Sequence, residues 1–181
     1  RIFTIGITDD VTNLSPENLS VLDLTPSYTF QAKFWGFGSD GTVGANKAAI
    51  KIIGDHTDKY VQAAFEYDSK KSGGLTISHL RFGDSPINSE YMTATLDFVA
   101  CHNMTYVRKY NLTKGLKAGG VFLLNTSWDL EHLSKNLPNE MKRYIAENNI
   151  RFYTIDAMKI ANETGMERRI NTIMQVAFFK L

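Results

Sequence analysis

The chain has 181 residues, of which 43% are hydrophobic and 22% charged, enough to bury the core of one domain but not of two ordinary ones. Because 20 Lys and Arg residues face 19 Asp and Glu residues, the formal net charge is +1, and we expect neither nucleic acid nor an anionic membrane as a partner. The single cysteine excludes an internal disulfide and a four-cysteine metal or cluster site within this chain.

The compartment is predicted from the same features. Low cysteine usage favours a reducing environment, no run approaches 18 apolar residues, and RIFTIGITDD lacks the residue order of a signal peptide. We therefore expect a cytoplasmic protein. The first residue is Arg rather than Met, so we also expect a chain processed or trimmed from a longer one.

Residues 1–31 differ in composition from the rest. They contain two prolines and several Asp, Asn, Ser and Thr residues, which is typical of a linker or wrapping arm. Residues 32–181 are expected to form the domain.

From residue 32 onwards the hydrophobic pattern predicts strands that alternate with helices. The expected strands are Ala32–Phe37, Tyr60–Tyr67, Leu75–Phe82, Asp97–Cys101, 121–125 and 151–155. The expected helices are Val43–Gly54, Tyr106–Leu116, a segment from Asp129 to about Asn148 that Pro138 breaks or kinks, and the chain from Asp156 onwards. Parallel strands need crossover connections, so this order indicates an α/β fold: a Rossmann-like, mostly parallel sheet with helices on both faces, preceded by an extended N-terminal arm.

A glycine-rich turn joins the first predicted strand to the first helix. Gly36-Phe37-Gly38-Ser39-Asp40-Gly41 is a G-x-G-x-x-G motif in the place where glycines let the backbone approach a phosphate at a helix N-terminus. Ser39 and Thr42 add hydroxyl groups. Asp40 is expected to stabilise the turn by accepting hydrogen bonds from backbone N–H groups. The alternative is that the glycines serve packing alone.

A second phosphate-friendly loop follows the second predicted strand. Residues 68–74 (DSKKSGG) contain two lysines, two serines and two glycines. Two such loops suit a ligand with separated phosphates, such as coenzyme A or NADP, and the residues alone do not choose between them. A solvated surface loop is the alternative for Lys70 and Lys71.

Other polar residues are expected to have ordinary structural roles. Cys101-His102-Asn103 ends a predicted strand, where adjacent side chains point to opposite faces, so we expect a buried Cys101 rather than a thiol nucleophile with a neighbouring base. His102 and Asn103 are expected to border a site or an interface. For Arg81, ordinary surface pairing is the default. The segment 173–179 (IMQVAFF) is apolar almost all round and should be buried, in this domain or against a partner.

Several long blocks resemble one family in order along the chain. FWGFGSDGTVGANKAAIKIIG, YDSKKSGGLTISHLRFG, DFVACHN, GLKAGGVFLLN, FYTIDAMKIANETG and RINTIMQVAFFKL resemble the gamma region of the pyruvate:ferredoxin (flavodoxin) oxidoreductases, within the 2-oxoacid:ferredoxin oxidoreductase family. IGITDDVTNLS is similar to the segment that leads into this region in the fused enzymes, which favours a fused domain over a separate subunit.

The resemblance implies a component of an oxidoreductase that is inactive alone. The family converts pyruvate and coenzyme A to acetyl-CoA and carbon dioxide and passes electrons to ferredoxin or flavodoxin. Thiamine diphosphate with magnesium and 4Fe-4S clusters are expected only on other domains or subunits, and the whole enzyme is expected to be a homodimer.

The resemblance also implies a partial coenzyme A site on this chain. Its expected residues are Gly38, Ser39, Asp40, Gly41, Thr42, Val43, Asn46 and Lys47, with Lys70, Lys71 and Ser72 as weaker candidates, and neither a catalytic residue nor a metal ligand is expected. Two alternatives stay open: an NAD(P)-binding Rossmann oxidoreductase domain, and a purely structural interaction module.

Overall fold

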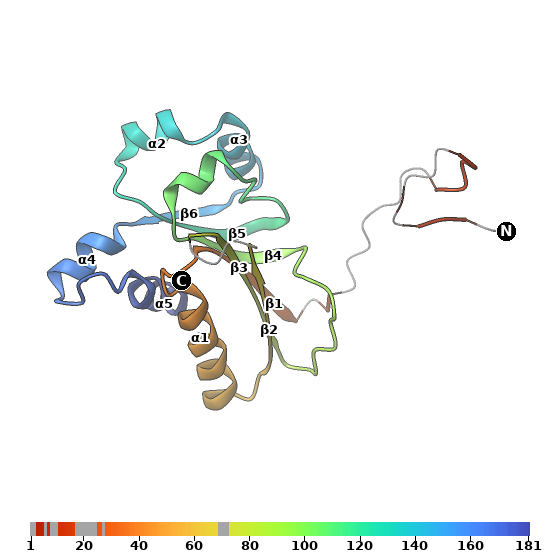
Figure 1. The fold of residues 1–181 in the computed structure, drawn as a ribbon, viewed down its shortest axis with the longest axis horizontal. Helices are drawn as coiled ribbons and strands as arrows, with labels where there is room; N and C mark the ends of the chain where they lie inside the picture. Colours follow the sequence, from red (N-terminus) through yellow and green to blue (C-terminus); the bar gives the residue numbers. More distant parts are fainter. Residues whose placement is uncertain (1–2, 6, 8–10, 17–24, 27, 69–72) are drawn as a thin grey trace.

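The computed structural model describes residues 3–5, 7, 11–16, 25–26, 28–68 and 73–181. The strands are β1 (Thr29–Phe37), β2 (Tyr60–Tyr67), β3 (Leu75–Gly83), β4 (Leu96–Cys101), β5 (Leu116–Asn125) and β6 (Arg151–Ile155). The helices are α1 (Thr42–His56), the 3-10 helix η1 (Met104–Arg108), α2 (Leu130–Asn136), α3 (Asn139–Glu147), α4 (Ala157–Glu163) and α5 (Ile170–Lys180). Figure 1 shows them around one central sheet.

The strands form one sheet in the order β2-β3-β1-β4-β5-β6. β3 is antiparallel to both of its neighbours, whereas the pairs β1–β4, β4–β5 and β5–β6 are parallel. One strand therefore runs against the other five, which confirms the predicted mostly parallel sheet.

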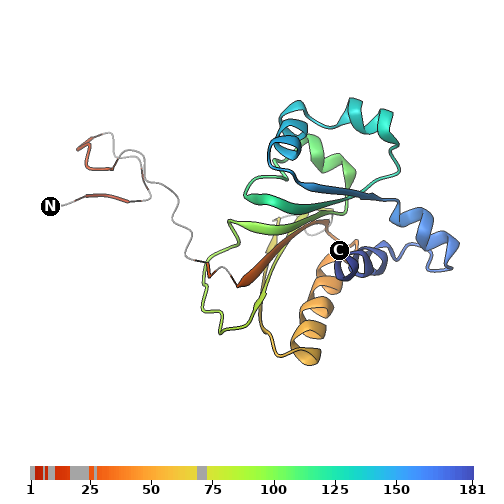
Figure 2. The same ribbon diagram turned by 180° about the vertical axis from the view of Figure 1, so that it is seen from behind.

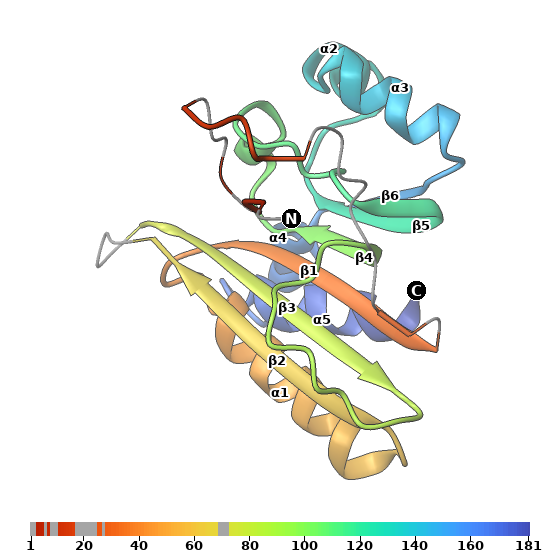
Figure 3. The ribbon, with the colours of Figure 1, turned by 90° about the vertical axis from the view of Figure 1, so that its right-hand side faces the viewer.

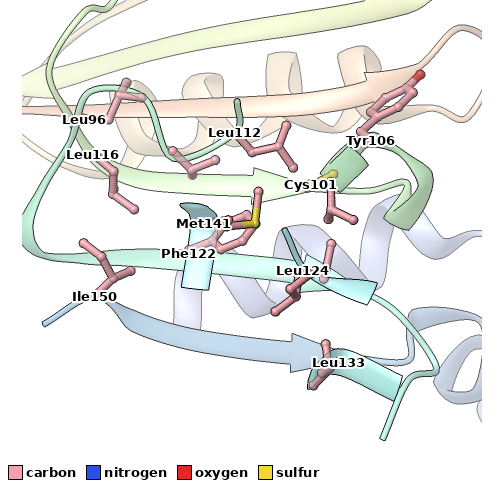
Figure 4. Close-up of a cluster of buried hydrophobic side chains, with 13 residues drawn as sticks. Leu96, Cys101, Tyr106, Leu112, Leu116, Phe122, Leu124, Leu133, Met141 and Ile150 are labelled. Atoms are coloured by element: carbon pink, nitrogen blue, oxygen red, sulfur yellow. The ribbon is translucent and has the colours of Figure 1, made fainter. Parts of the chain in front are cut away.

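Each face of the sheet carries its own hydrophobic cluster. On one face, α1 and α5 lie side by side (Figures 1 and 2) and bury Ala49, Ile53 and Phe178 against the strands. On the other face, Leu133 of α2 and Met141 of α3 pack against strand residues such as Phe122 (Figure 4). Helices therefore cover both faces, as predicted.

The connection after β4 differs from the sequence prediction. The helix expected at Tyr106–Leu116 is wrong: helical structure is limited to η1, which Asn103 caps by accepting the Thr105 N–H, and β5 already begins at Leu116. Gly115 explains the change, because its φ is 81° and a Cβ there would lie 2.0 Å from the Ala94 carbonyl oxygen. A tight turn at Gly115 is incompatible with a continuing helix.

Smaller differences concern element ends. β1 begins at Thr29 rather than at residue 32, and the long segment expected after Asp129 is two helices, α2 and α3, separated at Pro138. Asp129 caps α2 by accepting the His132 N–H, as predicted. No helix among the described residues is long and apolar enough to cross a bilayer.

The face of β2, β3 and β1 opposite α1 is polar. Arg81, expected in surface pairing, is instead 2% exposed and donates to Gln31 Oε1, Gln62 Oε1 and the Tyr91 carbonyl. Tyr91 belongs to the connection between β3 and β4, which crosses this face in Figure 3. The arginine is buried because this connection covers it, an arrangement that local sequence patterns do not report.

Candidate functional site

Asp40 fixes the conformation of the glycine turn. One of its carboxylate oxygens accepts the Phe37 N–H at 2.8 Å and the other accepts the Thr42 N–H at 2.7 Å. The residue before it, Ser39, adopts a φ of 82°, which a non-glycine residue rarely does unless its surroundings impose it. The predicted structural role of Asp40 is therefore confirmed.

Gly36, Gly38 and Gly41 each lie against neighbouring residues. A Cβ on Gly36 would lie 2.6 Å from Thr42 Cβ, so α1 starts against the strand that precedes it. Gly41 has a φ of 82°, and a Cβ there would lie 2.8 Å from Asn171 Nδ2 of α5. The Gly38 N–H donates to the Gly74 carbonyl oxygen at 2.7 Å. Packing thus explains part of this glycine pattern.

The turn also forms one wall of a cavity of about 360 Å³. Its lining comprises Phe37, Gly38, Ser39, Asp40, Gly41, Val43, Gly44, Tyr67, Asp68, Gly74, Leu75 and Thr76. Five of the predicted site residues, Gly38, Ser39, Asp40, Gly41 and Val43, are brought together here. The cavity lies where the glycine turn meets the ends of β2 and β3.

The remaining predicted residues lie elsewhere. Thr42 and Asn46 are buried, with 0% and 4% of their surface exposed. The Lys47 ammonium lies 5.3 Å from the centre of the Phe65 ring on β2, two residues before Tyr67 of the cavity wall. Lys70, Lys71 and Ser72 lie outside the described residues.

His102 ties the glycine turn to the neighbouring strands. Its ring Nδ1 lies 2.8 Å from the Thr42 hydroxyl oxygen. Its backbone N–H donates to the Trp35 carbonyl oxygen, and its backbone carbonyl accepts a hydrogen bond from Asn125 Nδ2. Burial lowers the pKa of His102 to about 4, although the charge of Asp40 acts in the opposite direction. The imidazole is therefore neutral at pH 7.

A larger cavity, of about 770 Å³, opens beside the first one. It is lined by Phe37, Asp40, His102, Asn103, Met104, Asn125, Thr126, Ser127, Asp156, Met158, Lys159, Asn162, Glu163 and Ile170. These residues follow the carboxyl ends of β1, β4, β5 and β6. Because α1 covers one face of the sheet and the connections after β4 and β5 cover the other, the cavity lies at the topological switch point, where open α/β sheets bind ligands.

The sequence predicted only part of this cavity. It placed His102 and Asn103 at the border of a site, and both line the cavity. It missed Asn125, whose side chain accepts the Ala157 N–H and donates to the His102 carbonyl, joining two strand ends to the start of α4. Asn125 and Asp156 each lie at the carboxyl end of a predicted parallel strand. Polar residues at that position indicate a ligand site in an open α/β sheet.

The described part of the chain contains no cluster of metal-ligating side chains. No three His, Cys, Asp or Glu residues cluster there in a geometry that would hold a metal ion. Cys101 is fully buried, as predicted, and burial raises the pKa of its thiol to about 12. It is therefore a core residue rather than a cluster ligand or a nucleophile.

A family model described as pyruvate ferredoxin/flavodoxin oxidoreductase matches residues 31–181. The chain is 60% identical over 179 residues to the pyruvate:ferredoxin oxidoreductase of Moorella thermoacetica and 59% identical over 180 residues to the pyruvate-flavodoxin oxidoreductase of Enterobacter agglomerans. Each match covers 99% of this chain and 15% of the relative. The chain thus spans about one seventh of the length of these relatives.

Solved structures share the fold. The pyruvate oxidoreductase subunit PORC of Thermotoga maritima superposes with a TM-score of 0.63 at 24% identity, covering 83% of this chain and 75% of that subunit. A 2-oxoglutarate:ferredoxin oxidoreductase of Magnetococcus marinus, with 2-oxoglutarate, coenzyme A and succinyl-CoA bound, gives a TM-score of 0.60 at 16% identity, covering 82% of this chain and 23% of that one. At these identities the likeness concerns the fold.

Proposed function

Because the chain belongs to the pyruvate ferredoxin/flavodoxin oxidoreductase family, we propose that it serves as the gamma-type domain of an enzyme that converts pyruvate and coenzyme A to acetyl-CoA and carbon dioxide. The whole enzyme passes the electrons to ferredoxin or flavodoxin. Within it, this domain contributes to coenzyme A binding and to assembly and does not catalyse the reaction alone. Thiamine diphosphate with magnesium and the 4Fe-4S clusters belong to other domains or subunits of the homodimer.

The pair of adjoining cavities at the strand ends is the observation that carries the coenzyme A proposal. Gly38, Ser39, Asp40 and Gly41 line the smaller cavity, at the N-terminus of the 15-residue helix α1. The positive end of the helix dipole stabilises a phosphate at such a place. Lys47, and Lys70 with Lys71 from the neighbouring loop, supply positive charge. Thr42 and Asn46 are buried at the start of the helix, where the Thr42 hydroxyl pairs with His102 Nδ1.

Exposed apolar side chains support the part in assembly. In the N-terminal arm, Phe3, Ile5 and Val11 are 59%, 67% and 85% exposed, and on α5 Val176 is 62% exposed. Exposed apolar surface of this kind is buried when domains associate. The other domains of the enzyme are the proposed partners.

Calorimetric titration of the chain with coenzyme A and with dephospho-coenzyme A tests the binding role. We expect saturable binding of coenzyme A that weakens without the 3′-phosphate. Replacing Lys70 and Lys71 by Ala should weaken coenzyme A and leave dephospho-coenzyme A unchanged.

Two lysines of α1 provide the matched control. Lys47→Ala should weaken both ligands, whereas Lys51→Ala, one turn further along and paired with Asp55, should weaken neither. If neither ligand binds to the chain, the coenzyme A site requires other domains of the enzyme, or the glycines serve packing alone.

A further inference from the structure

A glycine occupies the N-cap position of α1. Gly41 has no side chain to accept a hydrogen bond there, and none of the described residues in the first turn of the helix is acidic. Gly44 in the same turn is a poor helix former, which costs about 1 kcal/mol relative to alanine. Because side-chain caps and acidic residues normally stabilise this end of a helix, we expect the first turn of α1 to need support from another element.

The amide groups of this turn are open towards a ligand. Asp40 accepts the Thr42 N–H, whereas the N–H groups of Val43 and Gly44 have no acceptor among the described residues. Val43 and Gly44 also line the smaller cavity. A side-chain cap would occupy one of these amides. Support through the carbonyl groups of the turn, in contrast, leaves both amides open.

Two amide side chains of α5 contact those carbonyl groups. Gln175 Nε2 donates to the Ala45 carbonyl oxygen at 3.1 Å, and Asn171 Nδ2 donates to the Gly41 carbonyl oxygen at 3.5 Å. The two donors are four residues apart on α5, as are the two acceptors on α1, so the contacts repeat about once per turn along two helices that lie side by side (Figures 1 and 2). A Cβ on Gly41 would lie 2.8 Å from Asn171 Nδ2, so this close approach requires glycine.

α5 is anchored in the core and can therefore support its neighbour. Met174 and Phe178 are 1% and 8% exposed. The Ala45 N–H donates to the Gly41 carbonyl oxygen at 3.0 Å, which is a hydrogen bond of the first helical turn. The amides of α5 therefore contact the two residues that this hydrogen bond joins.

We propose that Gln175 and Asn171 are positioning residues, which stabilise the first turn of α1 through its carbonyl groups and so leave the amides of Val43 and Gly44 open. The proposal deepens the proposed function and rests on it for the identity of the ligand, because this turn is where the phosphates of coenzyme A are proposed to bind. The stabilisation of the turn itself needs no ligand, and it is measured without one.

Gln175→Met removes the donor and keeps the length of the side chain. Without ligand, amide hydrogen exchange of residues 45–47 should become roughly three- to tenfold faster, because the turn loses one hydrogen bond. Exchange in α2 and α3 should stay unchanged. The imidazole NMR signals of His102 should shift, since its Nδ1 pairs with the Thr42 hydroxyl of the same turn.

Two further variants accompany this one. Asn171→Ala should change the same signals in the same direction but less, because its contact with α1 is longer. Lys180→Met alters an exposed residue at the other end of α5 and should leave residues 45–47 and His102 as they are. Equal acceleration of exchange throughout the chain in Gln175→Met would reduce Gln175 to a general stabilising residue and overturn the inference.

Coenzyme A titration of the same variants separates this inference from the proposed function. Gln175→Met should weaken coenzyme A by at most the factor seen in exchange, because affinity falls with the fraction of chains whose turn is formed. Faster exchange of residues 45–47 in a chain that does not bind coenzyme A would support the positioning role and contradict a coenzyme A site on this chain alone. Unchanged exchange and unshifted His102 signals would overturn the inference, whether or not coenzyme A binds.

Discussion

Gly36 and Gly44, on either side of the glycine turn, contribute differently to the structure. Gly36 sits in β1, where a Cβ would lie 2.6 Å from Thr42 Cβ and 2.7 Å from Thr42 Oγ1. Gly44 lies in α1, where a Cβ would meet no atom within 4 Å. The sequence does not report this difference in packing, because it does not show which atoms lie opposite each Cα.

Replacing each of these glycines by alanine should change stability in opposite directions. Gly36→Ala forces the strand and α1 apart and should lower the free energy of unfolding by about 1–3 kcal/mol. Gly44→Ala should raise it by about 0.5–1 kcal/mol, because alanine is the better helix former. Urea denaturation of the two variants measures both changes, and equal effects would refute the packing role of Gly36.

His102 should make stability depend on pH. Burial lowers its pKa from 6.5 to about 4, so the unfolded chain binds a proton on this residue at a higher pH than the folded chain does. The contribution of His102 to the free energy of unfolding is therefore fully present above the pKa of the unfolded chain. It is lost as the pH falls from about 6.5 towards about 4. Between about pH 7.5 and about pH 5 the loss from this residue is on the order of 2 kcal/mol.

Unfolding of the native chain and of His102→Asn at both pH values measures this effect. Burial also lowers the pKa of His79, which acts in the same direction, so His102→Asn should retain part of the pH dependence. An unchanged pH dependence in this variant would contradict the assignment to His102.

Periodic elements were the predictable part of the fold. The alternation of strands and helices, the mostly parallel sheet and the glycine turn at the start of α1 all follow from patterns within short windows. The helix expected at Tyr106–Leu116 failed because the conformation there depends on the close approach of Gly115 to Ala94. Of the larger cavity, the sequence predicted only the border at His102 and Asn103. Residues at the ends of four separate strands line the cavity, and no local sequence pattern indicates that these strand ends lie close together.

The helix α5 divides its apolar residues between the core and the surface, whereas the sequence predicted burial either in this domain or against a partner. The Phe178 ring packs at 5.1 Å from the Phe34 ring and at 5.0 Å from the Phe98 ring, measured between centroids, whereas Phe179 is 47% exposed. One face of the helix is therefore part of the sheet core, and the other is available to a neighbouring domain.

Two neighbouring substitutions in α5 distinguish these faces. Phe178→Ala should cost about 3–5 kcal/mol of unfolding free energy through the cavity it leaves. Phe179→Ala should change stability by no more than about 0.5 kcal/mol, because surface truncations are usually small. Thermal or urea unfolding of both variants checks this, and comparable losses would place Phe179 in the core as well.

At the scale of the whole molecule, the two cavities lie side by side at one end of the sheet. Their walls consist of the glycine turn, buried His102 and the ends of β4, β5 and β6. The switch point lies there as well, because the sheet order places β1 next to β4. The chain covers 15% of relatives such as the Moorella enzyme. The exposed face of α5 is the surface that we propose to contact other domains. The proposed function places coenzyme A at this end of the sheet.

Amide hydrogen exchange of the chain with and without coenzyme A tests this placement. We expect slower exchange in residues 38–44, around His102 and in residues 125–127, with no change in α2 and α3, which do not line either cavity. Protection confined to α2, α3 or the outer face of α5 would contradict a coenzyme A site at this end of the sheet, and so would unchanged exchange at a saturating concentration of coenzyme A.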